Sequence, residues 1–144
     1  MNTDDFFAKV DAKLHKETET DAASLETASK NREFLEQVVT RLMPLVASYE
    51  AKLKEREIDT EVDGHQTGIS ITLRYKDGNH DDLSIGGVPK SSLIELKTTL
   101  IEKGQWFTSS KTYNHSKWQD SFFETRLQRL IENFLLHADK HGGV

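Results

Sequence analysis

The hydrophobic positions in the first third of the chain follow a helical period. From Asp21 onward they recur at alternating intervals of three and four residues, which is the spacing of a heptad seam. We expect long helical packing over residues 21–57, with a kink or break near Met43, because Pro44 removes a backbone hydrogen bond and clashes with the carbonyl of Thr40. The seam is polar only at Arg32 and consists of Leu25, Ala28, Arg32, Leu35, Val39, Leu42, Val46, Tyr49 and Leu53.

A shorter amphipathic helix is predicted before this seam. Thr3 and Asp4 can cap its first turn, and the carboxylate suits the positive end of the helix dipole. The next segment, ETETDAAS, has no apolar residue larger than alanine, so we expect a loop or frayed turn from Thr18 to Asp21. The apolar residues of this first helix are Phe6, Phe7, Val10 and Leu14.

Two interpretations of the seam stay open. The helix can pack on the rest of its own domain, or it can present its apolar stripe to another chain. In the second case the 21–57 helix is a homodimer or partner-binding surface. Its contact residues would be Leu35, Leu42, Tyr49 and Leu53.

The centre of the chain changes to a period of two. Apolar residues alternate with polar ones over 69–75, which predicts a strand with one buried face. Leu83 and Ile85 continue the pattern beyond the turn KDGN. The apolar residues of the two strands lie on the same face only if the residue numbers of each cross-strand pair add up to an even number. We therefore expect a three-residue loop with Gly78 in the left-handed conformation. The opposite face would carry Arg74, His80 and Asp82. The segment IDTEV, 58–62, predicts a further strand.

Two helices are expected after the hairpin. Residues 91–103 fit a helix, because Ser92 and Glu95 have capping-box spacing and Gly104 stands where a helix would stop. A strand through Ile94 and its alternate neighbours competes with this interpretation. Residues 116–140 give a broad apolar helical face.

The predicted fold is therefore α+β in a single domain, 1–144. It has an N-terminal helical segment (1–57), a small antiparallel sheet around the 69–85 hairpin (58–88), and C-terminal helices that pack on the sheet (91–140), with a loop at 104–117.

Composition and charge narrow the function classes. The 144 residues contain no cysteine, which excludes disulfides and thiolate zinc sites. Residues 1–64 carry nine Lys/Arg and fifteen Asp/Glu (−6), whereas residues 65–144 carry ten and nine (+1). The acidic first half argues against general duplex binding. With neither a signal-peptide pattern nor an apolar run of membrane-spanning length, we expect a cytoplasmic protein that does not enter membranes.

The search for catalytic chemistry gives one candidate. The run His80, Asp81 and Asp82 places a histidine beside two carboxylates, and its His-Asp pair resembles the HD dipeptide of metal-dependent phosphohydrolases. Successive side chains at a hairpin point to opposite faces, however, so solvated turn residues are the better interpretation. We expect no cofactor, no metal and no enzymatic activity.

A basic, aromatic segment at 104–118 is the second candidate site. Lys111, Tyr113, Lys117 and Trp118 could bind single-stranded RNA or DNA by stacking and charge. Alternatively, Trp106 and Phe107 turn into the core and Trp118 anchors the last helix. On that view Tyr113 is the ring left exposed.

The leading functional prediction is a non-catalytic protein–protein interaction module. Such a regulator, inhibitor or chaperone-like adaptor would hold its partner with an acidic helical face or with a sheet edge. Single-stranded nucleic-acid binding is the alternative.

Overall fold

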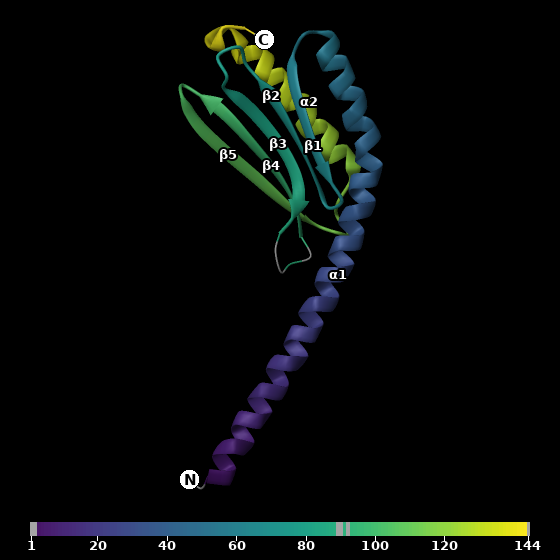
Figure 1. The fold of residues 1–144 in the computed structure, drawn as a ribbon, viewed down its shortest axis with the longest axis vertical. Helices are drawn as coiled ribbons and strands as arrows, with labels where there is room; N and C mark the ends of the chain where they lie inside the picture. The colour runs from purple at the N-terminus through teal and green to yellow at the C-terminus, as the bar shows by residue number, and fades with distance from the viewer. Residues whose placement is uncertain (1–2, 89–90, 92, 144) are drawn as a thin grey trace.

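The structure is a computed structural model that describes residues 3–88, 91 and 93–143, with the backbone alone for Thr3 and residues 14–28. Along the sequence, one helix precedes the sheet and a second helix follows it, and a short 3-10 helix comes last (Figure 1). The elements are α1 (Thr3–Glu55), β1 (Asp59–His65), β2 (Gly68–Arg74), β3 (His80–Gly87), β4 (Leu93–Glu102), β5 (Gln105–Asn114), α2 (Asp120–His137) and η1 (Ala138–His141).

The sheet is a five-stranded antiparallel meander. Its spatial order, β1-β2-β3-β4-β5, is the order of the strands in the sequence. α1 runs along the β1 edge, α2 lies behind the sheet, and β5 forms the opposite edge (Figure 1). We call the face toward α1 and α2 the helix side and the other face the open side. The predicted α+β class with an antiparallel sheet is confirmed.

The central hairpin has the predicted register. Ile71 pairs with Leu83 and Arg74 pairs with His80, so the paired positions sum to an even number. The loop has three residues, 76–78: the Tyr75 amide donates to the Asn79 carbonyl at 2.7 Å, and Gly78 has a φ of 91°. Glycine suits this left-handed position because it has no Cβ atom.

The prediction for residues 91–117 is wrong. The expected helix is strand β4, and the expected loop is largely strand β5, joined to β4 by a two-residue turn. Lys103 and Gly104 both have positive φ angles, 51° and 77°, as a type I′ hairpin turn requires. Pairing with β3 and β5 outweighs the local helix signals, because Leu96 faces the buried Ile85 of β3.

The predicted interruptions of the N-terminal helix are also wrong. α1 is one helix of 53 residues that continues through Thr18–Asp21 and through Pro44. Pro44 and Thr40 are both exposed, so the carbonyl that loses its amide partner lies where water can replace it. The chain therefore has one N-terminal helix rather than several.

The core lies between the sheet and the two helices. Phe123, Leu127, Leu130 and Phe134 of α2 are buried, as are Val38, Leu42 and Val46 of α1. Each side chain of this size contributes roughly 1.5–3 kcal/mol when fully buried. The helices are also joined directly, because Arg41 Nε lies 2.7 Å from Asp120 Oδ2.

Candidate functional site

The predicted partner-binding residues of α1 face the chain's own core. Leu35, Leu42 and Leu53 are buried in the hydrophobic cluster that includes the sheet. Tyr49 donates its hydroxyl hydrogen bond to Glu124 Oε2 at 2.9 Å, and burial raises the pKa of this hydroxyl. Packing on the same domain, the other interpretation of the seam, accounts for these four positions.

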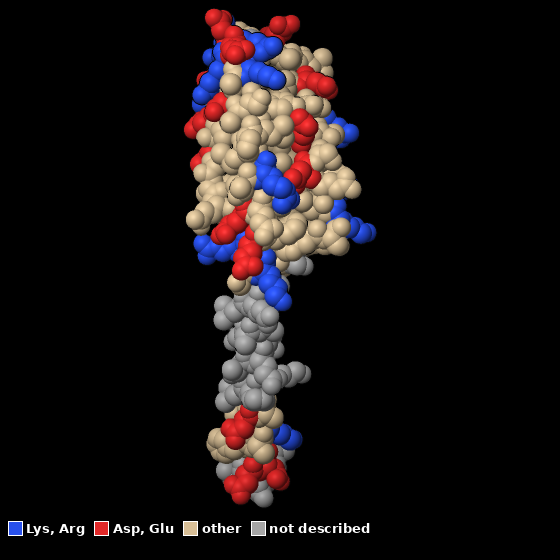
Figure 2. All heavy atoms as spheres, turned by 90° about the vertical axis from the view of Figure 1, so that its right-hand side faces the viewer, with Lys and Arg blue, Asp and Glu red and all other residues tan. Residues whose placement is uncertain are grey.

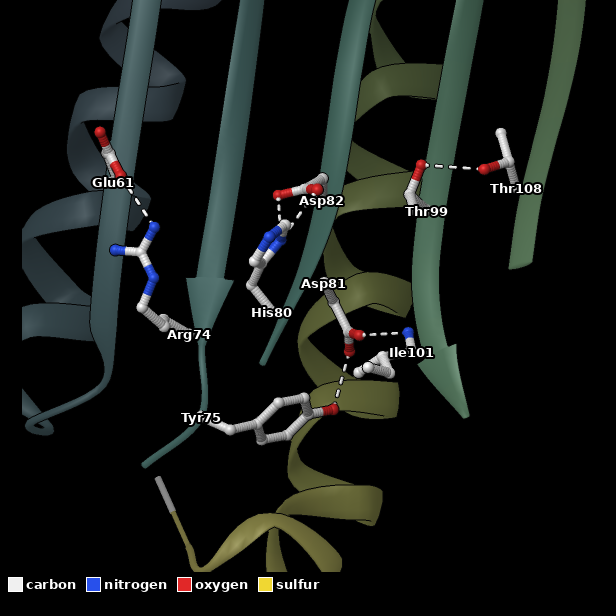
Figure 3. Close-up of polar contacts among 9 residues, drawn as sticks. All are labelled: Glu61, Arg74, Tyr75, His80, Asp81, Asp82, Thr99, Ile101 and Thr108. Carbon is white, nitrogen blue, oxygen red and sulfur yellow. Dashed lines mark hydrogen bonds and ion pairs between the residues drawn. The ribbon is translucent and has the colours of Figure 1, made fainter. Parts of the chain in front are cut away.

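The side chains of His80, Asp81 and Asp82 lie on two different faces of the sheet. His80 Nδ1 lies 3.1 Å from Asp82 Oδ1 on the open side of the sheet, whereas Asp81 points to the helix side (Figure 3). The three side chains therefore do not converge on one point. Across the part of the chain that the structure describes, no group of three or more His, Asp or Glu side chains could hold a metal ion.

Asp81 has a structural environment that the sequence did not reveal. It is fully buried and accepts hydrogen bonds from the Tyr75 hydroxyl at 2.8 Å and from the Ile101 amide at 3.0 Å (Figure 3). Two donors satisfy a buried carboxyl group that would otherwise destabilise the core. Asp81 of β3 thus joins β4 to Tyr75, the residue that follows β2, at the turn end of the central hairpin.

The predicted nucleic-acid-binding residues do not form a stacking platform. Trp118 is only 8% exposed, and its indole nitrogen donates to Asp120 Oδ1 at 2.8 Å. Tyr113 is partly buried, stacked on Phe122 with ring centroids 4.9 Å apart. Lys111 Nζ lies 5.3 Å from the centre of the Tyr113 ring, and Lys117 is exposed on the connection to α2.

The exposed rings of this segment are the two that were expected in the core. Trp106 is 48% exposed and Phe107 is 51% exposed, while Tyr113 is covered more than either. As neighbours on a strand, Trp106 and Phe107 point to opposite faces of β5. Trp106 lies on the open side against His80, with ring centroids 4.6 Å apart. The prediction that Tyr113 is the exposed ring is therefore wrong.

The N-terminal part of α1 projects beyond the sheet (Figure 1). We call residues 3–30 the N-terminal arm. At its tip, Phe6 and Phe7 are about half exposed, and their rings meet edge to face with centroids 5.4 Å apart. Acidic side chains cluster around this tip (Figure 2), among them Asp4 and Asp5 in the first turn of the helix. The tip combines exposed aromatic surface with negative charge.

A shallow cleft lies where the arm joins the body. Its volume is about 690 Å³, and its lining includes Asn31 and Arg32 of α1 and the β1–β2 turn at His65 and Gln66. No carboxylate is present among the described residues that line it. The polar part of its lining is thus made of amide, hydroxyl, imidazole and guanidinium groups.

Comparison with known proteins identifies no relative. No protein-family model, curated protein or solved structure matches the chain. Within residues 3–88, 91 and 93–143, no helix combines the length and apolar character needed to cross a membrane.

Proposed function

We propose that the chain is a non-catalytic protein–protein interaction module whose N-terminal arm is the binding element. The observation that carries this proposal is the pair of half-exposed phenylalanines, Phe6 and Phe7, at the tip of a helix that projects from the body. Exposed aromatic side chains on an amphipathic helix are typical anchors for a groove on another protein.

The energetics of the arm support this role. A helix in water gains most of its stability from packing an apolar face, and the tip of the arm has no such contact within the described part of this chain. Burial of Phe6 or Phe7 by a partner would contribute roughly 1.5–3 kcal/mol for each ring fully covered. The acidic residues around the rings would favour a partner with a basic surface.

The rest of the molecule suits a regulator, inhibitor or adaptor better than an enzyme. The one candidate constellation, His80 with Asp81 and Asp82, is split between the two faces of the sheet. The arm is continuous with the globular body, because α1 runs on from the arm into the core.

A capture experiment tests the proposed function. The wild-type chain and the double variant Phe6→Ser/Phe7→Ser are used as baits in native cell extract, with and without nuclease treatment. Lys9→Ala/Lys13→Ala, which changes exposed polar residues of the same arm, is the matched control. We expect nuclease-resistant protein capture by the wild type and the control, and its loss in the phenylalanine variant.

Two results would contradict this proposal. Capture that is equal for all three baits would show that the arm does not bind the partner. Capture that disappears with nuclease would favour the nucleic-acid alternative.

A further inference from the structure

A second surface of the molecule has chemistry complementary to the arm. A groove of about 270 Å³ lies between α2 and the β4–β5 hairpin on the helix side of the sheet. α2 packs mainly on β3, so β5 extends past it at the free edge of the sheet (Figure 1). We call this depression the α2–β5 groove. It is lined by Thr98, Leu100 and Ser109 from the strands and by Arg126, Arg129, Leu130 and Asn133 from α2.

The polar lining of the groove includes two arginines that make no ion pair with the described residues. Arg126 and Arg129 make no ion pair with any described residue, whereas the α2 carboxylates Asp120 and Glu124 bind α1. The Asn133 amide nitrogen and the Thr98 hydroxyl are buried and have no hydrogen-bond partner among the described residues. The two guanidinium groups therefore favour a ligand that supplies anionic acceptors.

Carboxylate groups are the acceptors that fit this lining best. A guanidinium binds a carboxylate through two parallel, charge-assisted hydrogen bonds. The floor of the groove is apolar at Leu100 and Leu130. The half-exposed Phe107 is paired with Leu100 and lies beside it. The expected ligand therefore carries carboxylates next to apolar rings.

The tip of the N-terminal arm has this composition. Asp4 and Asp5 directly precede Phe6 and Phe7, and Val10 follows one helical turn later. Over residues 3–30 the arm contains seven Asp/Glu and four Lys/Arg, a net charge of −3. α1 is continuous from Thr3 to Glu55, so the arm projects away from the body and does not fold back onto the groove of its own chain.

We propose that the arm of one copy docks in the α2–β5 groove of a second copy. Asp4 and Asp5 then face Arg126 and Arg129, and the phenylalanine rings lie against Leu100 and Phe107. This inference names the partner of the arm and rests on the proposed function. The docked helix covers the part of the helix side that α2 leaves open.

Engineered cysteines test this contact, because the natural chain has none. Ala8→Cys protein, whose free cysteine lies in the arm, is mixed with Ser109→Cys or with Ser110→Cys protein, and the mixture is oxidised. Ser109 and Ser110 are both exposed neighbours on β5, but only Ser109 lines the groove. We expect at least about tenfold more mixed disulfide with Ser109→Cys, since successive strand residues point to opposite faces.

Charge reversal provides the second part of the test. Arg126→Glu/Arg129→Glu in the Ser109→Cys protein should reduce the mixed disulfide about tenfold, and Asp4→Lys/Asp5→Lys in the Ala8→Cys protein should restore it. Lys97→Glu, on the open side, is the matched control and should leave the yield unchanged. Urea unfolding of each variant shows whether the fold is retained.

Two outcomes overturn the inference. One is equal disulfide yield with Ser109→Cys and Ser110→Cys from folded proteins. The other is a wild-type chain that stays monomeric by sedimentation at high micromolar concentration. Either result leaves the proposed function intact if the arm still captures another protein in a phenylalanine-dependent way. Failure of that capture as well would remove both.

Discussion

The Asp81 carboxyl group and the Tyr75 hydroxyl form a 2.8 Å hydrogen bond in the core of the protein. The Tyr75 ring also stacks on Phe134 of α2 and on His141 of η1, with centroid distances of 4.2 and 4.3 Å. This pair therefore connects the central hairpin to the C-terminal helices. Loss of the hydrogen bond between Asp81 and Tyr75 should destabilise the whole domain.

Replacing Asp81 by alanine should destabilise the fold by about 2–4 kcal/mol, because the Tyr75 hydroxyl and the Ile101 amide both lose their acceptor. The free energy of unfolding in urea measures this effect. Asp82→Ala, on the open side of the same strand, is the control and should cost less than about 1 kcal/mol. Equal effects of the two substitutions would show that the buried contacts of Asp81 are not important for stability.

Alkaline pH should destabilise the protein through Tyr75. Burial, together with the hydrogen bond to Asp81, raises the pKa of this hydroxyl well above its usual range. The unfolded chain therefore loses this proton first. The contribution of Tyr75 is complete below its ordinary pKa of about 10 and is lost as the pH rises above it. In the Tyr75→Phe variant, the free energy of unfolding should fall less steeply above about pH 10 than in the wild type. An unchanged pH profile would contradict this assignment.

The ion pair between Arg41 and Asp120 should contribute stability that disappears in acid. The hydrogen bond from Arg41, opposed by burial, lowers the pKa of Asp120. The contribution is present above the unfolded-state pKa of about 3.9 and is lost as the pH falls through the lower folded-state value. Both side chains are more than a third exposed, so Asp120→Asn should cost only about 0.5–1 kcal/mol at pH 7. Unfolding curves at pH 7 and pH 2.5 should show the difference between variant and wild type shrinking at the lower pH.

The β4–β5 turn should respond in opposite directions to two substitutions. Gly104→Ala should destabilise the protein by about 1–2 kcal/mol, because a side chain is added at a φ of 77°. Lys103→Gly should be neutral or stabilising by up to about 1 kcal/mol, because Lys103 already occupies a left-handed conformation at 51°. Thermal unfolding of the two variants compares these effects. Equal destabilisation by both would argue against a type I′ turn.

The N-terminal arm should be dispensable for the stability of the body. Phe6→Ser/Phe7→Ser should change the free energy of unfolding by less than about 0.5 kcal/mol at low protein concentration, where self-association is absent. Phe123→Ala, in the core, should cost about 3–5 kcal/mol in the same measurement. A large effect of the phenylalanine pair on the monomer would mean that the arm packs on the body.

The sequence was informative where one face of an element is buried. The alternation from Ile69 to Tyr75, continued at Leu83 and Ile85, predicted the central hairpin and its register, because a one-residue shift would turn these side chains toward solvent. The last helix was predicted for the same reason, since its apolar stripe includes Phe123, Leu127 and Phe134. Both patterns report directly on burial.

The sequence was misleading where the pattern is compatible with two periods. In β4, Leu93, Leu96 and Leu100 fit a helix, while Leu96 and Leu100 also fit a strand. Pairing with β3 and β5 decides between the two structures, and a rule based on the local sequence does not take these neighbouring strands into account. β5 gave no alternation, because most of its residues are exposed on both faces. The Thr, Tyr, Trp and Phe residues of this segment were the available strand signal.

The candidate surfaces depend on tertiary placement in the same way. Arg126, Arg129 and Asn133 were not distinguished from other polar residues of the last helix, although their spacing places them on one flank. Their importance comes from Thr98 and Ser109, which only the strand pairing brings opposite them. Phe6 and Phe7 were found as a helical pattern, but their exposure required the structure.

The meander order of the sheet has a consequence for how the protein folds. Each strand pairs only with its neighbour in the sequence, so every hairpin closes a short loop and can form in the order of synthesis. Contacts between α1 and α2, such as Arg41 with Asp120 and Tyr49 with Glu124, close much larger loops, because the partners lie 79 and 75 residues apart. Docking of α2 across α1 is thus expected late in folding, and substitutions in these two pairs should accelerate unfolding while leaving the folding rate nearly unchanged.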